Sequence, residues 1–90
     1  MSKMVYKYHL PIGASRKKLR LRSPPGIPPA LLGEDPKGDF CVWFEVDDEH
    51  HEVERTFFII PTGYTVSADC FHQGSAVCGD FVWHLYERLT

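Results

Sequence analysis

The chain has 90 residues, of which 43% are hydrophobic and 24% are charged, and its formal net charge is −2. These values are typical of one small globular domain spanning residues 1–90, and they argue against a second domain or a wholly disordered chain. Uninterrupted apolar runs such as Phe57–Pro61 are far shorter than the ~18 residues that a transmembrane helix requires, so we expect no membrane partner.

The N-terminal third of the chain predicts two strands. Val5–Leu10 alternates with a period of two, which places Tyr6 and Tyr8 on one face. Lys18–Arg22 alternates in the same way and directs basic side chains outward. Four prolines in Ser23–Pro29 exclude a helix or a central strand there, so we expect an extended connection.

The middle of the chain predicts three further strands. Ala30–Leu32 is a short candidate, and Gly33–Asp39 has the composition of a turn. Phe40–Asp47 is apolar on both faces at its start, which is typical of a central strand. Val53–Ile60 follows directly across the acidic segment Asp47–Glu52, and this succession predicts an antiparallel hairpin.

The C-terminal part predicts a hairpin between Ser75–Cys78 and Phe81–Glu87, joined by a Gly-Asp turn. No apolar pattern of helical period is sustained anywhere in the chain. The sequence therefore predicts an all-β fold of six or seven short antiparallel strands in a small barrel or sandwich. A single helical turn is compatible with Leu31–Asp35 or Ser67–Phe71.

Charge is distributed unevenly: residues 1–37 carry eight basic and two acidic side chains, and residues 38–90 carry two basic and ten acidic ones. Such asymmetry is typical of a surface that steers a partner, unless strands from the two halves pair and neutralise each other. The basic candidates for partner binding are Lys7, Arg16, Lys17, Lys18, Arg20 and Arg22. The acidic candidates, on the expected hairpin, are Asp47, Asp48, Glu49, Glu52 and Glu54.

No pattern typical of catalysis occurs, such as a glycine-rich phosphate loop or a nucleophile elbow. We therefore predict that the chain is not an enzyme and has no catalytic residue, metal or cofactor. His50 and His51 are adjacent, and adjacent side chains of an extended segment point opposite ways, so they rarely share one ion. A further set lacks the close ligand pairs of zinc modules, and whether its members meet stays open: Cys70, His72, Cys78 and His84.

Four segments together resemble a family of short bacteriophage proteins of unassigned function: Val5-Tyr-Lys-Tyr-His-Leu-Pro, Phe40-Cys-Val-Trp-Phe-Glu-Val-Asp, Arg55-Thr-Phe running into Pro61-Thr-Gly-Tyr, and Gly79-Asp-Phe-Val-Trp-His-Leu-Tyr-Glu. The resemblance covers most of the chain and consists of strand and turn signatures. This chain has Tyr64 where the family carries histidine after Thr-Gly. The resemblance implies a small protein made in a phage-infected bacterium.

Two functions are compatible with these observations. The first is a non-enzymatic phage accessory protein that binds a host bacterial protein in the host cytoplasm and modulates or inhibits it, through the basic or the acidic set. The alternative is a small β-barrel that binds nucleic acid through the basic strand Lys18–Arg22. The few, unpaired cysteines fit a reducing cytoplasm, and exposed sheet edges are compatible with a homodimer.

Overall fold

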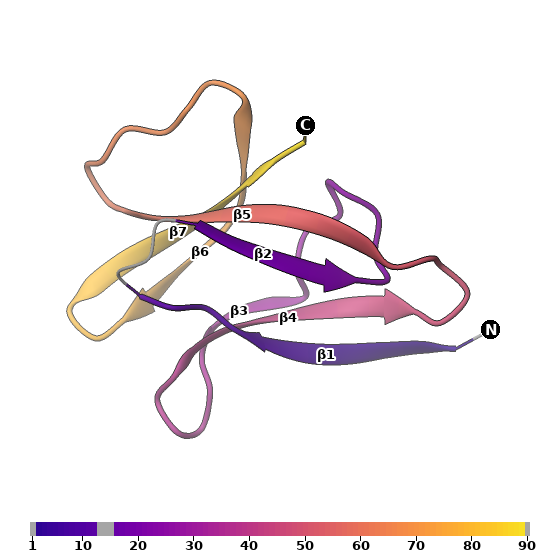
Figure 1. The fold of residues 1–90 in the computed structure, drawn as a ribbon. Coiled ribbons are helices and arrows are strands. Elements are labelled where there is room, and N and C mark those ends of the chain that lie inside the picture. The colour runs from indigo at the N-terminus through magenta and orange to yellow at the C-terminus, as the bar shows by residue number, and fades with distance from the viewer. Residues whose placement is uncertain (1, 13–15, 90) are drawn as a thin grey trace.

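Seven antiparallel strands in two sheets form the fold in the computed structural model, which describes residues 2–12 and 16–89 (Figure 1). The strands in chain order are β1 (Lys3–His9), β2 (Arg16–Leu21), β3 (Leu31–Glu34), β4 (Phe40–Asp47), β5 (Val53–Pro61), β6 (Cys70–Cys78) and β7 (Phe81–Arg88). No helix occurs in this described part, and neither expected helical turn formed: Leu31–Glu34 is a strand, and Cys70 N donates to Ser67 O in a simple turn. Consequently none of the described residues forms a helix able to cross a membrane.

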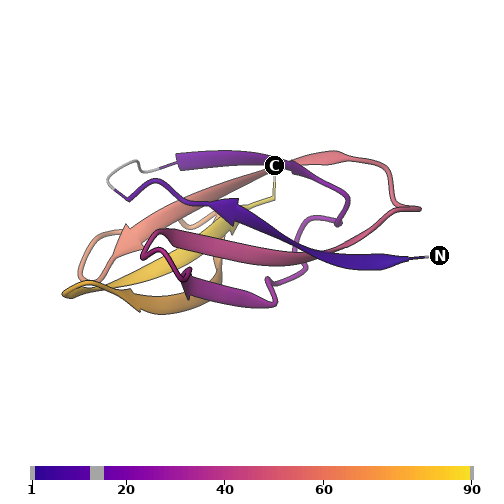
Figure 2. The same cartoon turned by 90° about the horizontal axis from the view of Figure 1, so that it is seen from below.

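The two sheets pack face to face as a sandwich, as Figure 2 shows from below. One sheet has three strands in the order β1-β4-β3, and the other has four in the order β2-β5-β7-β6. The sheets do not close into a barrel, because no described ladder joins an edge strand of one sheet to an edge strand of the other. Of the two predicted architectures, the sandwich is confirmed and the barrel is wrong.

Alternation along the strands builds the core between the sheets. Phe44 and Val42 of β4 are fully buried, and the Phe44 ring lies 5.4 Å from the ring of Phe57 across the sandwich. Each such buried apolar side chain stabilises the fold by about 1.5–3 kcal/mol. The period of two places seven of the core residues on shared faces: Leu10, Leu19, Leu21, Phe40, Val42, Phe44 and Val46. Phe57, Ile59 and Leu85 of β5 and β7 complete the core.

The predicted hairpin between Phe40–Asp47 and Val53–Ile60 is wrong. β4 lies between β1 and β3 in one sheet, whereas β5 lies between β2 and β7 in the other. Both strands direct an apolar face toward the same core, so placing them in opposite layers buries both faces against each other. The central position expected for β4 is confirmed, and so is the turn at Gly79, whose φ of 62° suits a tight connection between β6 and β7.

An ion pair lies inside the sandwich between Arg55 of β5 and Glu87 of β7. Arg55 Nε and Nη2 donate to the two Glu87 oxygens at 2.8 and 2.7 Å, and both side chains are fully buried. The guanidinium also donates to Ser23 Oγ and to the carbonyl of Ile27, in the proline-rich connection. Its carbon lies 4.9 Å from the Phe44 ring centroid. The pair therefore contacts both layers and the connection at once.

Replacing Glu87 by Gln should destabilise the fold by about 3–5 kcal/mol, because the Arg55 charge would stay buried without its partner. The measurement is the free energy of unfolding in urea. The matched control is Glu52→Gln, which removes an exposed ion pair with Arg20 and should cost less than about 1 kcal/mol. Equal losses in the two variants would contradict this account of the core.

Candidate functional site

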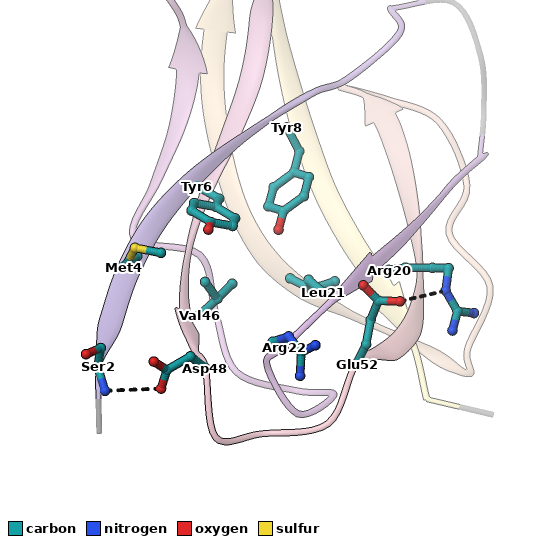
Figure 3. Close-up of a pocket in the computed structure, with 10 residues that line it drawn as sticks. All are labelled: Ser2, Met4, Tyr6, Tyr8, Arg20, Leu21, Arg22, Val46, Asp48 and Glu52. Atoms are coloured by element: carbon teal, nitrogen blue, oxygen red, sulfur yellow. Dashed lines mark hydrogen bonds and ion pairs between the residues drawn. The ribbon is translucent and has the colours of Figure 1, made fainter.

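A depression of the described surface lies between β1 and β2, the edge strands of the two sheets on one side of the sandwich (Figure 3). Its volume is about 340 Å³. We call this depression the groove. Its lining residues are Ser2, Met4, Tyr6, Tyr8, Arg20, Leu21, Arg22, Val46, Asp48 and Glu52. The groove thus has an apolar floor, with polar residues around it.

The groove exists because β1 extends beyond the sheet that it faces. Leu10, directly after β1, is buried, Tyr8 is half-buried, and the next inward side chains of β1, Tyr6 and Met4, are 47% and 46% exposed. Tyr8 contacts the core through an edge-to-face arrangement with Phe44, and its burial raises the pKa of its phenol above the usual value. Tyr6 and Met4 have no such cover, so their apolar surface is available to a partner.

The rim of the groove carries both signs of charge. Arg20 Nε donates to Glu52 Oε1 at 3.1 Å on the β2 side, and Arg22 Nη1 donates to the carbonyl of His50. On the β1 side the backbone N–H of Ser2 donates to Asp48 Oδ1 at 3.1 Å, and Figure 3 shows both side-chain contacts of the groove as dashed lines. A partner would therefore meet a ring of mixed charge around an apolar floor.

The predicted basic set does not form one patch. Arg16, Lys18 and Arg20 share the outer face of β2, as the alternation indicated. Lys7 lies on the outer face of the other sheet, where its Nζ donates to Asp35. Lys17 points to the opposite side of β2 from its neighbours and is half-buried.

The predicted acidic set is likewise divided. Glu54 lies opposite Arg20 in the β2–β5 ladder, and Glu54 Oε1 is 3.8 Å from Lys18 Nζ. Asp48 belongs to the rim of the groove, while Asp47 Oδ1 accepts from the backbone N–H of Glu49 in the turn. Strands from the two halves of the sequence thus pair, and their opposite charges partly neutralise each other. This arrangement is the alternative that the sequence offered to a dipolar surface.

The set of Cys70, His72, Cys78 and His84, considered above for zinc, does not come together within the described residues. Cys70 and Cys78 lie at opposite ends of β6, and Cys78 packs against the core. All three cysteines of the chain are free. His72 and His84 do approach each other, because Ser75 Oγ lies 2.7 Å from His72 Nε2 and 2.6 Å from His84 Nδ1.

The orientation of His50 and His51 differs from the predicted one. Their rings stack with centroids 4.6 Å apart and planes 17° apart, so they lie on the same side of the chain. The segment bends here, and the opposite orientation of neighbours holds only in an extended strand.

Two arrangements of side chains were not predicted from the sequence. The outer face of the four-stranded sheet carries a cross-strand row from β2 to β6: Arg16, Phe58, Tyr86 and His72. The sequence signal for this row was the presence of aromatic and basic residues at even-numbered positions of Val53–Pro61 and Phe81–Arg88. The second arrangement is the ion pair of Lys7 with Asp35, whose atoms lie 2.8 Å apart, and it depends on a loop that the sequence pattern does not place.

Asp35 organises the turn between β3 and β4. Its Oδ1 accepts from the backbone N–H groups of Lys37 and Asp39, each at 2.9 Å, and its Oδ2 accepts from Lys7 Nζ. The hydrogen bond from Lys7, with those from the backbone, lowers the pKa of Asp35 from 3.8 to about 2. The carboxylate therefore stabilises the fold only while it is ionised.

The stability advantage of the wild-type chain over Asp35→Asn should shrink as pH falls from 3.8 toward 2. In that interval the unfolded chain takes up a proton on Asp35 that the folded chain does not yet bind, so protonation favours unfolding. Urea unfolding of both proteins across this range measures the effect. In Lys7→Gln the pH dependence should weaken, since the largest cause of the lowered pKa is removed. A difference between wild type and Asp35→Asn that stays constant over the interval would contradict this account.

The fold and the groove define the chain as a small all-β sandwich with an open, apolar-floored edge. Residues 1–90 match the family model described as a domain of unknown function, DUF7352, and the chain belongs to that family. No curated protein and no solved structure matches the chain.

Proposed function

We propose that this chain is a non-enzymatic accessory protein that binds another protein through the groove and modulates it. The observation that carries the proposal is an apolar groove of about 340 Å³ that opens between two unpaired sheet edges. The resemblance to short bacteriophage proteins supports the finer proposal that the partner is a host bacterial protein and that binding takes place in the host cytoplasm.

The groove has two features that suit recognition of an extended segment. The outer edges of β1 and β2 carry backbone groups that no described strand pairs, so a partner strand can extend either sheet. Met4 and Tyr6 supply exposed apolar surface beside these edges. Tyrosine is among the residues that most often anchor protein interfaces, because it buries a large rigid ring at small entropic cost.

The charges around the groove favour a protein over a polyanion. Arg20 is paired with the Glu52 carboxylate, and Arg22 shares the rim with the Asp48 carboxylate, so the cations of the rim are accompanied by anions. A rim of both signs can match a mixed protein surface and fix the register of binding. The net charge of −2 also opposes association with phosphate-rich partners.

Tyr6→Ala should weaken capture of the partner by about 30-fold, the loss expected for a tyrosine anchor worth about 2 kcal/mol. The measurement is affinity capture from bacterial lysate with washes at low and moderate salt, followed by quantification of the retained protein. Tyr64→Ala is the matched control, because Tyr64 is 73% exposed and lies outside the groove. Retention of the same stoichiometric partner by Tyr6→Ala, with loss from Tyr64→Ala, would overturn the proposal.

A second candidate function is the binding of single-stranded nucleic acid on the outer face of the four-stranded sheet. The cross-strand row that contains Phe58 and Tyr86 supports it, since Arg16 lies at one end and the Arg88 guanidinium lies 5.1 Å from the Phe58 ring centroid. Aromatic rings flanked by cations are the means by which sheets stack unpaired bases and hold phosphates.

This second candidate predicts that a labelled single-stranded oligonucleotide binds at low salt and dissociates steeply as salt rises, in fluorescence anisotropy. Tyr86→Ala should weaken binding by about 1–3 kcal/mol per lost stacking contact, whereas Tyr6→Ala should leave it unchanged. Absence of any anisotropy change at low salt would eliminate the candidate and leave the protein-binding proposal standing.

A further inference from the structure

A group of metal-ligating side chains lies on the outer face of the three-stranded sheet, away from the groove. His9 ends β1, Cys41 is the second residue of β4, and Asp35 and Asp39 bound the turn between β3 and β4. One ligand atom from each of His9, Asp35 and Cys41 lies within 4.8 Å of the others. The β1–β4 register creates this meeting, because it places His9 directly opposite Cys41.

The distances within the group suit a tetrahedral ion. His9 Nδ1 lies 3.6 Å from Cys41 Sγ and 4.0 Å from Asp39 Oδ2. A zinc ion bound about 2.3 Å from sulfur and about 2.0–2.1 Å from nitrogen, with a tetrahedral angle between them, separates the two atoms by about 3.6 Å. The sulfur and nitrogen are thus already spaced as two corners of such a site.

Cys41 is placed unusually for a free cysteine. It points to the outer face of its sheet and yet is fully buried, with the charged side chains of Asp35, Lys7 and Asp39 near it. Its neighbour on the other side in the ladder is Gly33, where an added Cβ would meet nothing within 4 Å. The buried thiol therefore lies near the carboxylates of Asp35 and Asp39.

We propose that His9 Nδ1, Cys41 Sγ and the Asp35 carboxylate bind a zinc ion, with the exposed Asp39 carboxylate or a water as the fourth ligand. Mixed nitrogen, sulfur and oxygen donors of this kind are those that zinc selects. The backbone N–H groups of Lys37 and Asp39 hold Asp35 Oδ1 and so fix the orientation of the carboxylate, whose Oδ2 would bind the ion in place of Lys7.

Lys7 is the competitor for this site. Its ammonium donates to Asp35 Oδ2 at 2.8 Å, and so it occupies the oxygen that the ion would use. The Lys7 side chain is 37% exposed and can move into solvent when the ion enters. Binding also displaces the thiol proton of Cys41 to solvent, so that the ion meets the Cys41 thiolate, the His9 imidazole and the Asp35 carboxylate.

The test uses the full chain, purified without a histidine tag and treated with a chelator, and titrates it with Co²⁺ as a spectroscopic substitute for Zn²⁺. The wild-type protein should develop a sulfur-to-cobalt charge-transfer band and the intense visible bands of a tetrahedral ion, and Zn²⁺ should abolish both. His9→Gln should lose them, and it should fold normally because the His9 side chain is 62% exposed. His51→Gln, at another exposed histidine, is the matched control and should keep them.

Lys7→Met separates a metal site from a purely structural cluster. If Lys7 competes with the ion, this variant should bind Co²⁺ about tenfold or more tightly than the wild type. Weaker binding by Lys7→Met, absence of the charge-transfer band at saturating Co²⁺, or equal spectra for wild type and His9→Gln would each overturn the proposal. The site lies on a different sheet face from the groove, so its failure leaves the proposed function untouched.

Discussion

The buried pair of Arg55 and Glu87 is the interaction on which the sandwich depends. Removing two charges from water costs several kcal/mol per ion, and only a complete set of hydrogen bonds offsets that cost. Glu87 meets this condition by accepting from Arg55, from Gln73 Nε2 and from the backbone N–H of Gly26. The guanidinium in turn stacks near Phe44 of the opposite sheet and holds the carbonyl of Ile27. This one polar centre thus fixes the relative position of both layers and of the proline-rich connection.

The position of the layers explains where the surface is open. Leu10 and Tyr8 lie over the core, but the first half of β1 runs past the edge of β2, so Tyr6 and Met4 face a groove rather than a sheet. The opposite face of β1 carries different side chains, because there Lys7 and His9 belong to the group around Cys41. Alternation along one strand therefore supplies an apolar surface suited to a protein partner on one side and candidate metal ligands on the other.

Much of the fold could be predicted from the sequence, because a period of two is a local property. It identified Phe40–Asp47 with its exact bounds, the inward faces of β1, β2 and β4, and the turn at Gly79. It could not assign strands to sheets, since the pairing of β5 with β2 and β7 rather than β4 is decided by the shared core. Arg55 and Glu87 occupy inward positions of predicted strands, and charged residues at such positions were a signal of a buried pair. The division of the charged sets, and the meeting of His9 with Cys41, depend on non-local register that alternation does not specify. The non-enzymatic role, the partner and the location in the cell stay predictions.

The central claim is that partners bind at the groove, and site-specific photo-cross-linking tests it most directly. A photoreactive amino acid is placed at Met4, within the groove, or at Val77 of β6, which is 65% exposed and distant from it in the sheet order. Each protein is irradiated in bacterial lysate and the products are separated by mass. The account predicts one discrete cross-linked species from position 4 and none from position 77. No adduct from position 4, or the same adduct from both positions, would contradict it.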